Sequence, residues 1–199
     1  MDAYRWNVKL EFAPGTRIDL ERLIPIFHRW IQDRTLDELL IDVADYRHVP
    51  QGPGVLLIAH DAHYAVDEVD GRLGLLYARK RPASGTLAGR LRDAAQKVLD
   101  AGLALEREAA LGLVIPGERW SVRANDRLLA PNDERIWRTV EPELRALFDD
   151  LYAGARFELR KEDDPRGLFG VAVTAAEKPG LAVLRERLAA ASLPLAATA

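Results

Sequence analysis

Cysteine is absent from this chain of 199 residues. Its absence excludes thiol catalysis, thiolate metal sites and disulfide cross-links, and it agrees with a reducing compartment. Long hydrophobic runs are also missing, because the run from Val55 to Ala59 is far shorter than the ~20 residues that a membrane-spanning helix needs. The first residues have neither the basic start nor the apolar stretch of a secretory signal. We therefore expect a soluble, cytoplasmic protein that does not enter a membrane.

Charge of one sign is not in large excess. The 28 basic and 31 acidic side chains give a formal net charge of -3, so no overall field favours nucleic acid. The clearest basic cluster is Arg79-Lys80-Arg81, followed by Arg90, Arg92 and Lys97 and diluted by Asp93. Such charge runs on amphipathic helices are usually solvated faces, so we do not expect nucleic acid as a partner.

Motifs for phosphate binding and for serine nucleophiles are missing as well. The chain has neither the Walker nor the Rossmann glycine pattern. Its serines, Ser84, Ser121 and Ser192, lack the glycines of a nucleophile elbow. The sequence therefore identifies no cofactor, and it gives no support to serine hydrolase chemistry.

The chain does contain a regular order of strand and helix patterns, and its length is sufficient to bury a core. Apolar residues that alternate or form short runs predict strands at residues 5–12, 39–43, 55–60, 64–69, 72–80, 119–124, 157–161 and 168–174. Apolar residues at helical spacing predict helices at residues 20–31, 82–112, 133–152 and 181–191. This order is typical of an α+β fold with a mixed or antiparallel sheet, helices packed on one face and a long central helix.

Three local signals refine this prediction. Asp70-Gly71 favours a two-residue hairpin turn. Pro25 and Pro142 lie inside predicted helices, where we expect a late start or a kink for the first and a bend or a break for the second. The central helix would be about 40 Å long at ~1.5 Å per residue, which exceeds what one small sheet covers. We therefore expect its far end to pack on something else, such as a second subunit.

The elements occur in the same order in residues 1–112 and 113–199, which we interpret as two pseudo-repeated βαββα halves of one compact unit. Arg5-Trp6-Asn7-Val8-Lys9 matches Arg119-Trp120-Ser121-Val122-Arg123, and Pro50-Gln51-Gly52 matches Pro165-Arg166-Gly167. The first half carries an additional hairpin at residues 64–80. The alternative is that two unrelated α+β stretches share a common order of elements. If the halves are related, the seam between them is a place where a small ligand would bind.

Three of the four histidines occur in one short stretch that is also rich in carboxylates. The stretch contains Asp42, Asp45, His48, His60, Asp61, His63, Asp67 and Glu68. Such side chains suit zinc or non-haem iron, but on a strand His60 and His63 would point to opposite faces, so a metal site needs a bend between them. An acid–base pair of His60 with Asp42 or Asp45 is one alternative. Plain polar groups at a strand end and in a turn are the other.

The candidate residues of this stretch fall into three groups. For catalysis they are Asp42, Asp45, His48 and His60; for ligand binding Tyr46, Arg47, Gln51, His63 and Tyr64; and for a metal ion His60 and His63.

Two functional hypotheses follow. The first is a non-catalytic module that binds a small molecule or a partner and self-associates, with a homodimer as the expected assembly. The alternative is a metal-dependent or acid–base enzyme whose site is built around His48, His60, His63 and neighbouring carboxylates. Because the histidines are concentrated in the first half, we expect the function to lie there or in the adjoining seam.

Overall fold

The computed structural model describes residues 3–49 and 52–191 of the chain. Within them, four α-helices accompany an eight-stranded sheet whose neighbouring strands are all antiparallel. The strands are β1 (Trp6–Glu11), β2 (Leu40–Asp45), β3 (Val55–Ala59), β4 (Ala62–Asp67), β5 (Gly74–Arg79), β6 (Arg119–Ala124), β7 (Phe157–Lys161) and β8 (Phe169–Ala175). The helices are α1 (Leu23–Asp33), α2 (Leu87–Glu106), α3 (Glu134–Tyr152) and α4 (Leu181–Ala190), with 3-10 turns η1 (Leu20–Arg22) and η2 (Val69–Gly71). The α+β class with an antiparallel sheet is confirmed.

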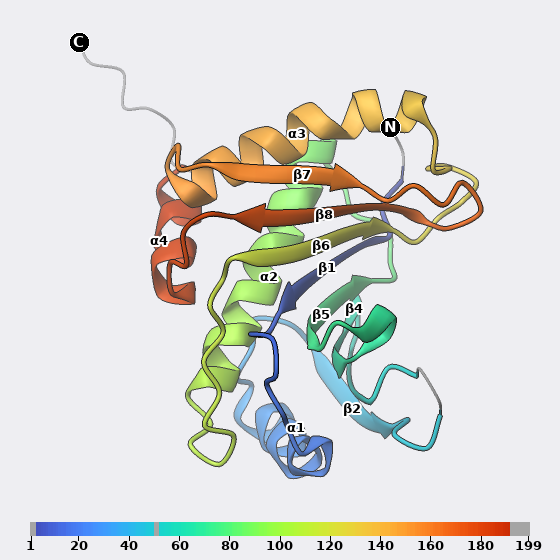
Figure 1. Cartoon of the computed structure of the whole chain (residues 1–199). Helices are drawn as coiled ribbons and strands as arrows, with labels where there is room; N and C mark the ends of the chain where they lie inside the picture. Colours follow the sequence, from blue (N-terminus) through green and yellow to red (C-terminus); the bar gives the residue numbers. More distant parts are fainter. Residues whose placement is uncertain (1–2, 50–51, 192–199) are drawn as a thin grey trace.

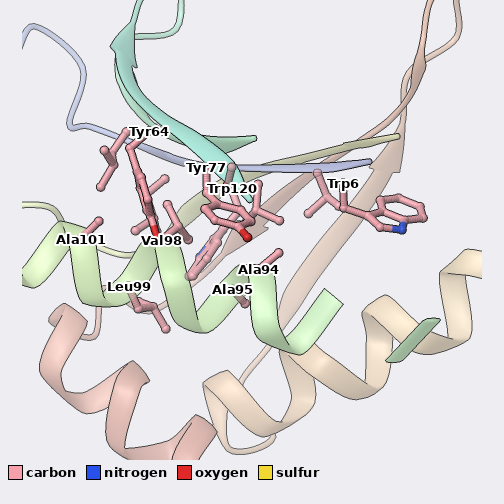
Figure 2. Packing of buried hydrophobic residues seen from close by; sticks show 14 of the residues in the cluster. Trp6, Tyr64, Tyr77, Ala94, Ala95, Val98, Leu99, Ala101 and Trp120 are labelled. Atoms are coloured by element: carbon pink, nitrogen blue, oxygen red, sulfur yellow. The ribbon is translucent and has the colours of Figure 1, made fainter. Parts of the chain in front are cut away.

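The strand order β2-β3-β4-β5-β1-β6-β8-β7 places β1 and β6 side by side within the sheet. As Figure 1 shows, α2, α3 and α4 lie on one side of this sheet. In Figure 2 the side chains of Tyr64, Tyr77 and Trp120 extend from the strands toward α2. Trp6 belongs to the same hydrophobic core. The buried residues of α1 belong to the same hydrophobic core. None of the helices within the described residues is both long and apolar enough to cross a membrane.

The central helix is shorter than the sequence predicts, because α2 begins and ends with local polar contacts. Thr86 caps its start, where the Thr86 Oγ1 accepts a hydrogen bond from the Gly89 amide at 3.1 Å. Its 20 residues span about 30 Å at ~1.5 Å per residue. At the far end, the Glu106 carboxylate accepts a hydrogen bond from the Ile115 amide at 2.7 Å, and Leu105 is fully buried. The far end of α2 therefore packs against other parts of this chain.

The predictions about the hairpin turn and about the two helix prolines have different outcomes. The hairpin of β4 and β5 is present, but its predicted two-residue turn is wrong, since residues 68–73 connect the strands through η2. Asp67 stabilises this longer connection by accepting a hydrogen bond from the Val69 amide at 3.1 Å. The late helix start is confirmed, because α1 begins at Leu23 and Pro25 lies in its first turn, where a missing N–H costs little. The helix α3 runs without a break past Pro142.

The neighbouring strands β1 and β6 each carry a tryptophan that makes a similar hydrogen bond. The indole of Trp6 donates a hydrogen bond to the carbonyl of Ala3 at 3.0 Å, and that of Trp120 donates one to the carbonyl of Gly117 at 3.1 Å. Tyr152 from α3 joins the second contact, since its hydroxyl lies 2.9 Å from the Trp120 nitrogen and donates to the Gly117 carbonyl at 2.8 Å. Both indoles are buried, so these hydrogen bonds have no water to replace them.

We predict that Trp120→Phe lowers the free energy of unfolding by about 3 kcal/mol, because the smaller ring leaves a cavity and deprives the Tyr152 hydroxyl of a buried donor. Urea denaturation followed by circular dichroism measures the change. Trp137→Phe, at a half-buried indole on α3, is the matched control and should cost less. Equal losses in the two variants would contradict the role given to the Trp120 hydrogen bonds.

Candidate functional site

The alternation of β1 and β6 directs their polar side chains away from the helices. Trp6, Val8 and Leu10 point into the core, so Asn7 and Lys9 lie on the opposite face of the sheet. The register places Asn7 opposite Arg123 and Lys9 opposite Ser121. These four side chains gather between β1 and β6 on the face of the sheet that the helices leave uncovered.

A cavity of about 300 Å³ lies on this face, at the small end of the range of ~300–1,000 Å³ typical of ligand sites. We call it the hollow. It is lined by Asn7, Lys9, Pro53, Asp67, Val69, Arg72, Leu76, Ser121, Arg123, Asn125 and Leu168. The lining therefore combines three basic groups and one carboxylate with polar uncharged groups and aliphatic side chains.

A buried ion pair forms one wall of the hollow. The Lys9 ammonium lies 2.5 Å from Oδ1 of Asp67, and the two side chains are only 8% and 2% exposed. Gly74 makes the contact feasible, because a Cβ at this position would lie 2.9 Å from Cε of Lys9. The lysine stem thus crosses β5 above a glycine to reach the end of β4. Charges this deeply buried carry a desolvation cost that pairing only partly offsets.

A second ion pair lies on the β6 side of the hollow. The Arg123 guanidinium is 2.7 Å from Oε1 of Glu162, which follows β7. Its carboxylate lies over Gly170, where a Cβ would be 2.6 Å from Oε2. Arg72 pairs with two carboxylates, since its guanidinium is 3.2 Å from Oε1 of Glu162 and 3.4 Å from Oε1 of Glu11. Two arginines therefore share one carboxylate oxygen beside the hollow.

The hollow also contains a polar atom for which the described part of the chain supplies no hydrogen-bond partner. Oδ1 of Asn7 is buried and unpaired. An amide oxygen that stays unpaired in a buried position costs free energy unless a donor reaches it. The hollow thus presents one vacant acceptor beside its basic groups.

The predicted catalytic residues of the first half occupy an exposed edge. Asp45 forms two contacts with the Arg47 guanidinium, at 2.8 and 2.9 Å, and these hydrogen bonds lower the pKa of Asp45 to about 2. Asp42 accepts a hydrogen bond from the neighbouring Val43 amide at 2.8 Å. The His48 ring stacks on Tyr46, with ring centroids 6.4 Å apart. Each of these contacts is local.

The two predicted metal ligands have different surroundings. His60 is exposed in the turn between β3 and β4, and its Nε2 lies 2.7 Å from the Arg81 guanidinium. His63 is half-buried on β4, its Nδ1 has no partner among the described residues, and burial followed by the charge of Lys80 lowers its pKa. Nowhere in residues 3–49 and 52–191 do three histidine or carboxylate side chains gather closely enough to hold a metal ion.

The predicted ligand-binding residues divide between the core, the rim of the hollow and the undescribed part of the chain. Tyr64 is buried, its hydroxyl donates to the Glu38 carboxylate at 2.7 Å, and burial strongly raises its pKa. Tyr46 and Arg47 line a shallow depression that shares Asp67 with the hollow. Gln51 lies outside the described residues. The loop after β2 thus borders the hollow.

The basic cluster of the sequence is largely paired. Arg79 lies 3.3 Å from Asp93, Arg92 contacts the Asp150 carboxylate, and Lys97 donates a hydrogen bond to a backbone carbonyl at 2.6 Å. These side chains are therefore engaged within the chain.

Sequence reasoning missed four charged residues of the site: Lys9, Arg72, Arg123 and Glu162. On an alternating strand Lys9 has the same pattern as a solvent-exposed residue, and its partner is 58 positions away. One signal was present, because the match of the two tryptophan-led strands already aligned Lys9 with Arg123. Asp67 was included in the acidic cluster, but nothing in the sequence distinguished it from the exposed carboxylates around it.

Comparisons with known proteins add no relative: no family model, no curated protein and no solved structure matches this chain.

We predict that Lys9→Met lowers the free energy of unfolding by about 3 kcal/mol, because it leaves the buried Asp67 carboxylate without its partner. Adding Asp67→Asn to this variant should restore more than half of the loss. Arg47→Met removes a cation from an exposed pair and should leave stability unchanged within error. Urea denaturation at pH 7 measures all three variants, and a second substitution that deepens the loss would contradict the pairing argument.

A second prediction concerns pH. The folded protein keeps His63 neutral at pH values where the unfolded chain, with an ordinary pKa of 6.5, binds a proton. The unfolded state then holds more protons, so stability falls as the pH drops below about 6.5. We expect His63→Gln to lose less stability between pH 7 and pH 5 than the parent protein. His28→Gln, at an exposed position on α1, should keep the parent's slope; an identical slope in His63→Gln would exclude this residue as the cause.

Proposed function

We propose that the protein is a non-catalytic module that binds a small polar molecule in the hollow on the uncovered face of its sheet. The observation that carries this proposal is the buried Lys9–Asp67 pair in the wall of a cavity, beside the unpaired Oδ1 of Asn7. Ligand sites characteristically combine aliphatic walls with a few fixed polar groups, and here Leu76 and Leu168 supply part of the aliphatic wall. A buried charge pair adds little net stability to the fold by itself, so we assign the Lys9–Asp67 pair a role in binding.

We further propose that the two halves of the chain are related and that the hollow lies on their seam. Three observations support this. The tryptophans make the same hydrogen bond to the carbonyl three residues earlier. Val8 pairs with Val122, the residue that the tryptophan match also assigns to it, so a local two-fold axis passes through this pair. Lys9 and Arg123 occupy matched positions, and each reaches a carboxylate across a glycine.

The enzyme alternative gains no support from the arrangement of the histidines. His60 contacts Arg81, and His48 stacks on Tyr46, whereas an acid–base pair needs a carboxylate within hydrogen-bond reach of the ring. The Asp61 carboxylate lies 3.9 Å from Nε2 of His60, on the exposed surface. Self-association as a homodimer stays a prediction.

A fragment screen by ¹H–¹⁵N NMR tests the binding proposal. We expect polar fragments to shift amides of β1, β5 and β6 around the hollow, and Leu76→Trp to abolish these shifts because the indole fills the hollow. Leu56→Trp is the control, since Leu56 is another half-buried aliphatic residue of a strand but does not line the hollow. A library that shifts none of these amides, or shifts that persist in Leu76→Trp, would refute the proposal.

A further inference from the structure

Resting on the proposed function, we infer that the ligand of the hollow is an uncharged polyhydroxyl molecule of monosaccharide size, recognised by Lys9, Asn7 and Ser121. Hydroxyl groups supply both the acceptor oxygens that the lysine lacks and the donor that the asparagine lacks. The three side chains are neighbours on the uncovered face of the sheet, where β1 pairs with β6, and all of them line the hollow.

The Lys9 ammonium has two N–H donors to spare. An ammonium group carries three donors. Within residues 3–49 and 52–191, the only hydrogen bond of this group is the one to Asp67. The Lys9 side chain is 8% exposed, so bulk water has little access to it. Because buried donors that stay unpaired cost free energy, an acceptor oxygen from a ligand is the complement that this group lacks.

Two polar side chains beside the lysine also have no hydrogen-bond partner in the described part of the chain. Oδ1 of Asn7 is buried and unpaired, and an amide oxygen accepts but does not donate. Ser121 lies directly opposite Lys9 in the pairing of β1 with β6. Its hydroxyl, which can both donate and accept, makes no hydrogen bond to the described residues. Donors, an acceptor and a group of both kinds therefore occur close together.

A ligand with several hydroxyl groups matches this combination. One hydroxyl can accept a hydrogen bond from Lys9 and donate one to Asn7, and a second can pair with Ser121. The Leu76 and Leu168 side chains offer an aliphatic surface for the C–H groups of such a molecule. The cavity volume of about 300 Å³ limits the ligand to a single sugar ring or a short polyol.

The Lys9–Asp67 pair favours a ligand without charge. A carboxylate in contact with Lys9 would lie beside the buried Asp67 carboxylate, and an ammonium in contact with Asp67 would lie beside Lys9. Like charges this close together in a buried site are costly. Arg72 and Arg123 also line the hollow, but each already contacts the Glu162 carboxylate.

NMR titration with D-ribose, D-glucose, xylitol and myo-inositol tests the inference, and the tightest binder then serves as the probe for the variants. We expect Ser121→Ala to bind it about threefold more weakly, because one hydrogen bond is lost. The double variant Lys9→Met/Asp67→Asn removes the ammonium donors without leaving a buried charge, and we expect it to bind about tenfold more weakly. Thr174→Val, which removes a hydroxyl from β8 outside the hollow, should keep the affinity of the parent.

A matched set of ligands tests the charge of the molecule. D-glucuronate carries a carboxylate and D-glucosamine an ammonium, and we expect both to bind the parent protein more weakly than D-glucose does. Tighter binding of either charged sugar overturns the inference.

Parent affinity in either Ser121→Ala or the double variant also overturns it, and so does a panel of which no member binds. The fragment screen separates this failure from failure of the proposed function. If other fragments occupy the hollow while the four polyols do not, the binding proposal stands and the polyhydroxyl ligand is wrong. If nothing occupies the hollow, both are wrong.

Discussion

The antiparallel pairing of β1 with β6 is the constraint on which the other features depend. These strands are more than a hundred residues apart in sequence, yet Val8 pairs with Val122 within an eight-stranded sheet. Because strand residues alternate between faces, this single register directs Trp6 and Trp120 into the core and Lys9 and Arg123 to the uncovered face. If one of the two strands slipped by one residue, its apolar side chains would move to the hollow face and its polar side chains into the core. The same strand register thus places the core residues on one face of the sheet and the residues of the hollow on the other.

Under the proposed function, this arrangement links stability and binding through a small number of charged groups. The Lys9–Asp67 pair is held in place by the strands that build the core, and Gly74 provides the space for the lysine stem. The Arg123–Glu162 pair lies on the β6 side of the hollow, and Arg72 pairs with Glu162 and with Glu11. Fixed, partly dehydrated charges on a rigid sheet are expensive for folding but well suited to binding, since they need no rearrangement when a ligand arrives.

Much of the fold could be predicted from the sequence, because apolar periodicity reports directly on burial. The strands at 119–124 and 157–161 were predicted with the bounds that they have, and the helix predicted at 133–152 spans Glu134–Tyr152. The errors lie where side chains override a local pattern. The central helix is shorter than its alanine-rich stretch because Thr86 and Glu106 bind backbone amides near its ends, and Asp70-Gly71 forms part of a 3-10 turn rather than a tight hairpin.

The candidate site was less accessible to prediction. The site hypotheses centred on residues 42–68 because histidines and carboxylates are close together there in sequence. The hollow is instead assembled from five separate segments of the chain, which strand pairing brings together. Only Asp67 and the loop near Pro53 belong to both. A crystal structure of the protein grown with a mixture of small polar compounds tests the central claim most directly. We predict electron density for a bound molecule between Asn7, Lys9 and Arg123; a hollow that holds only water while compounds bind elsewhere would contradict the account.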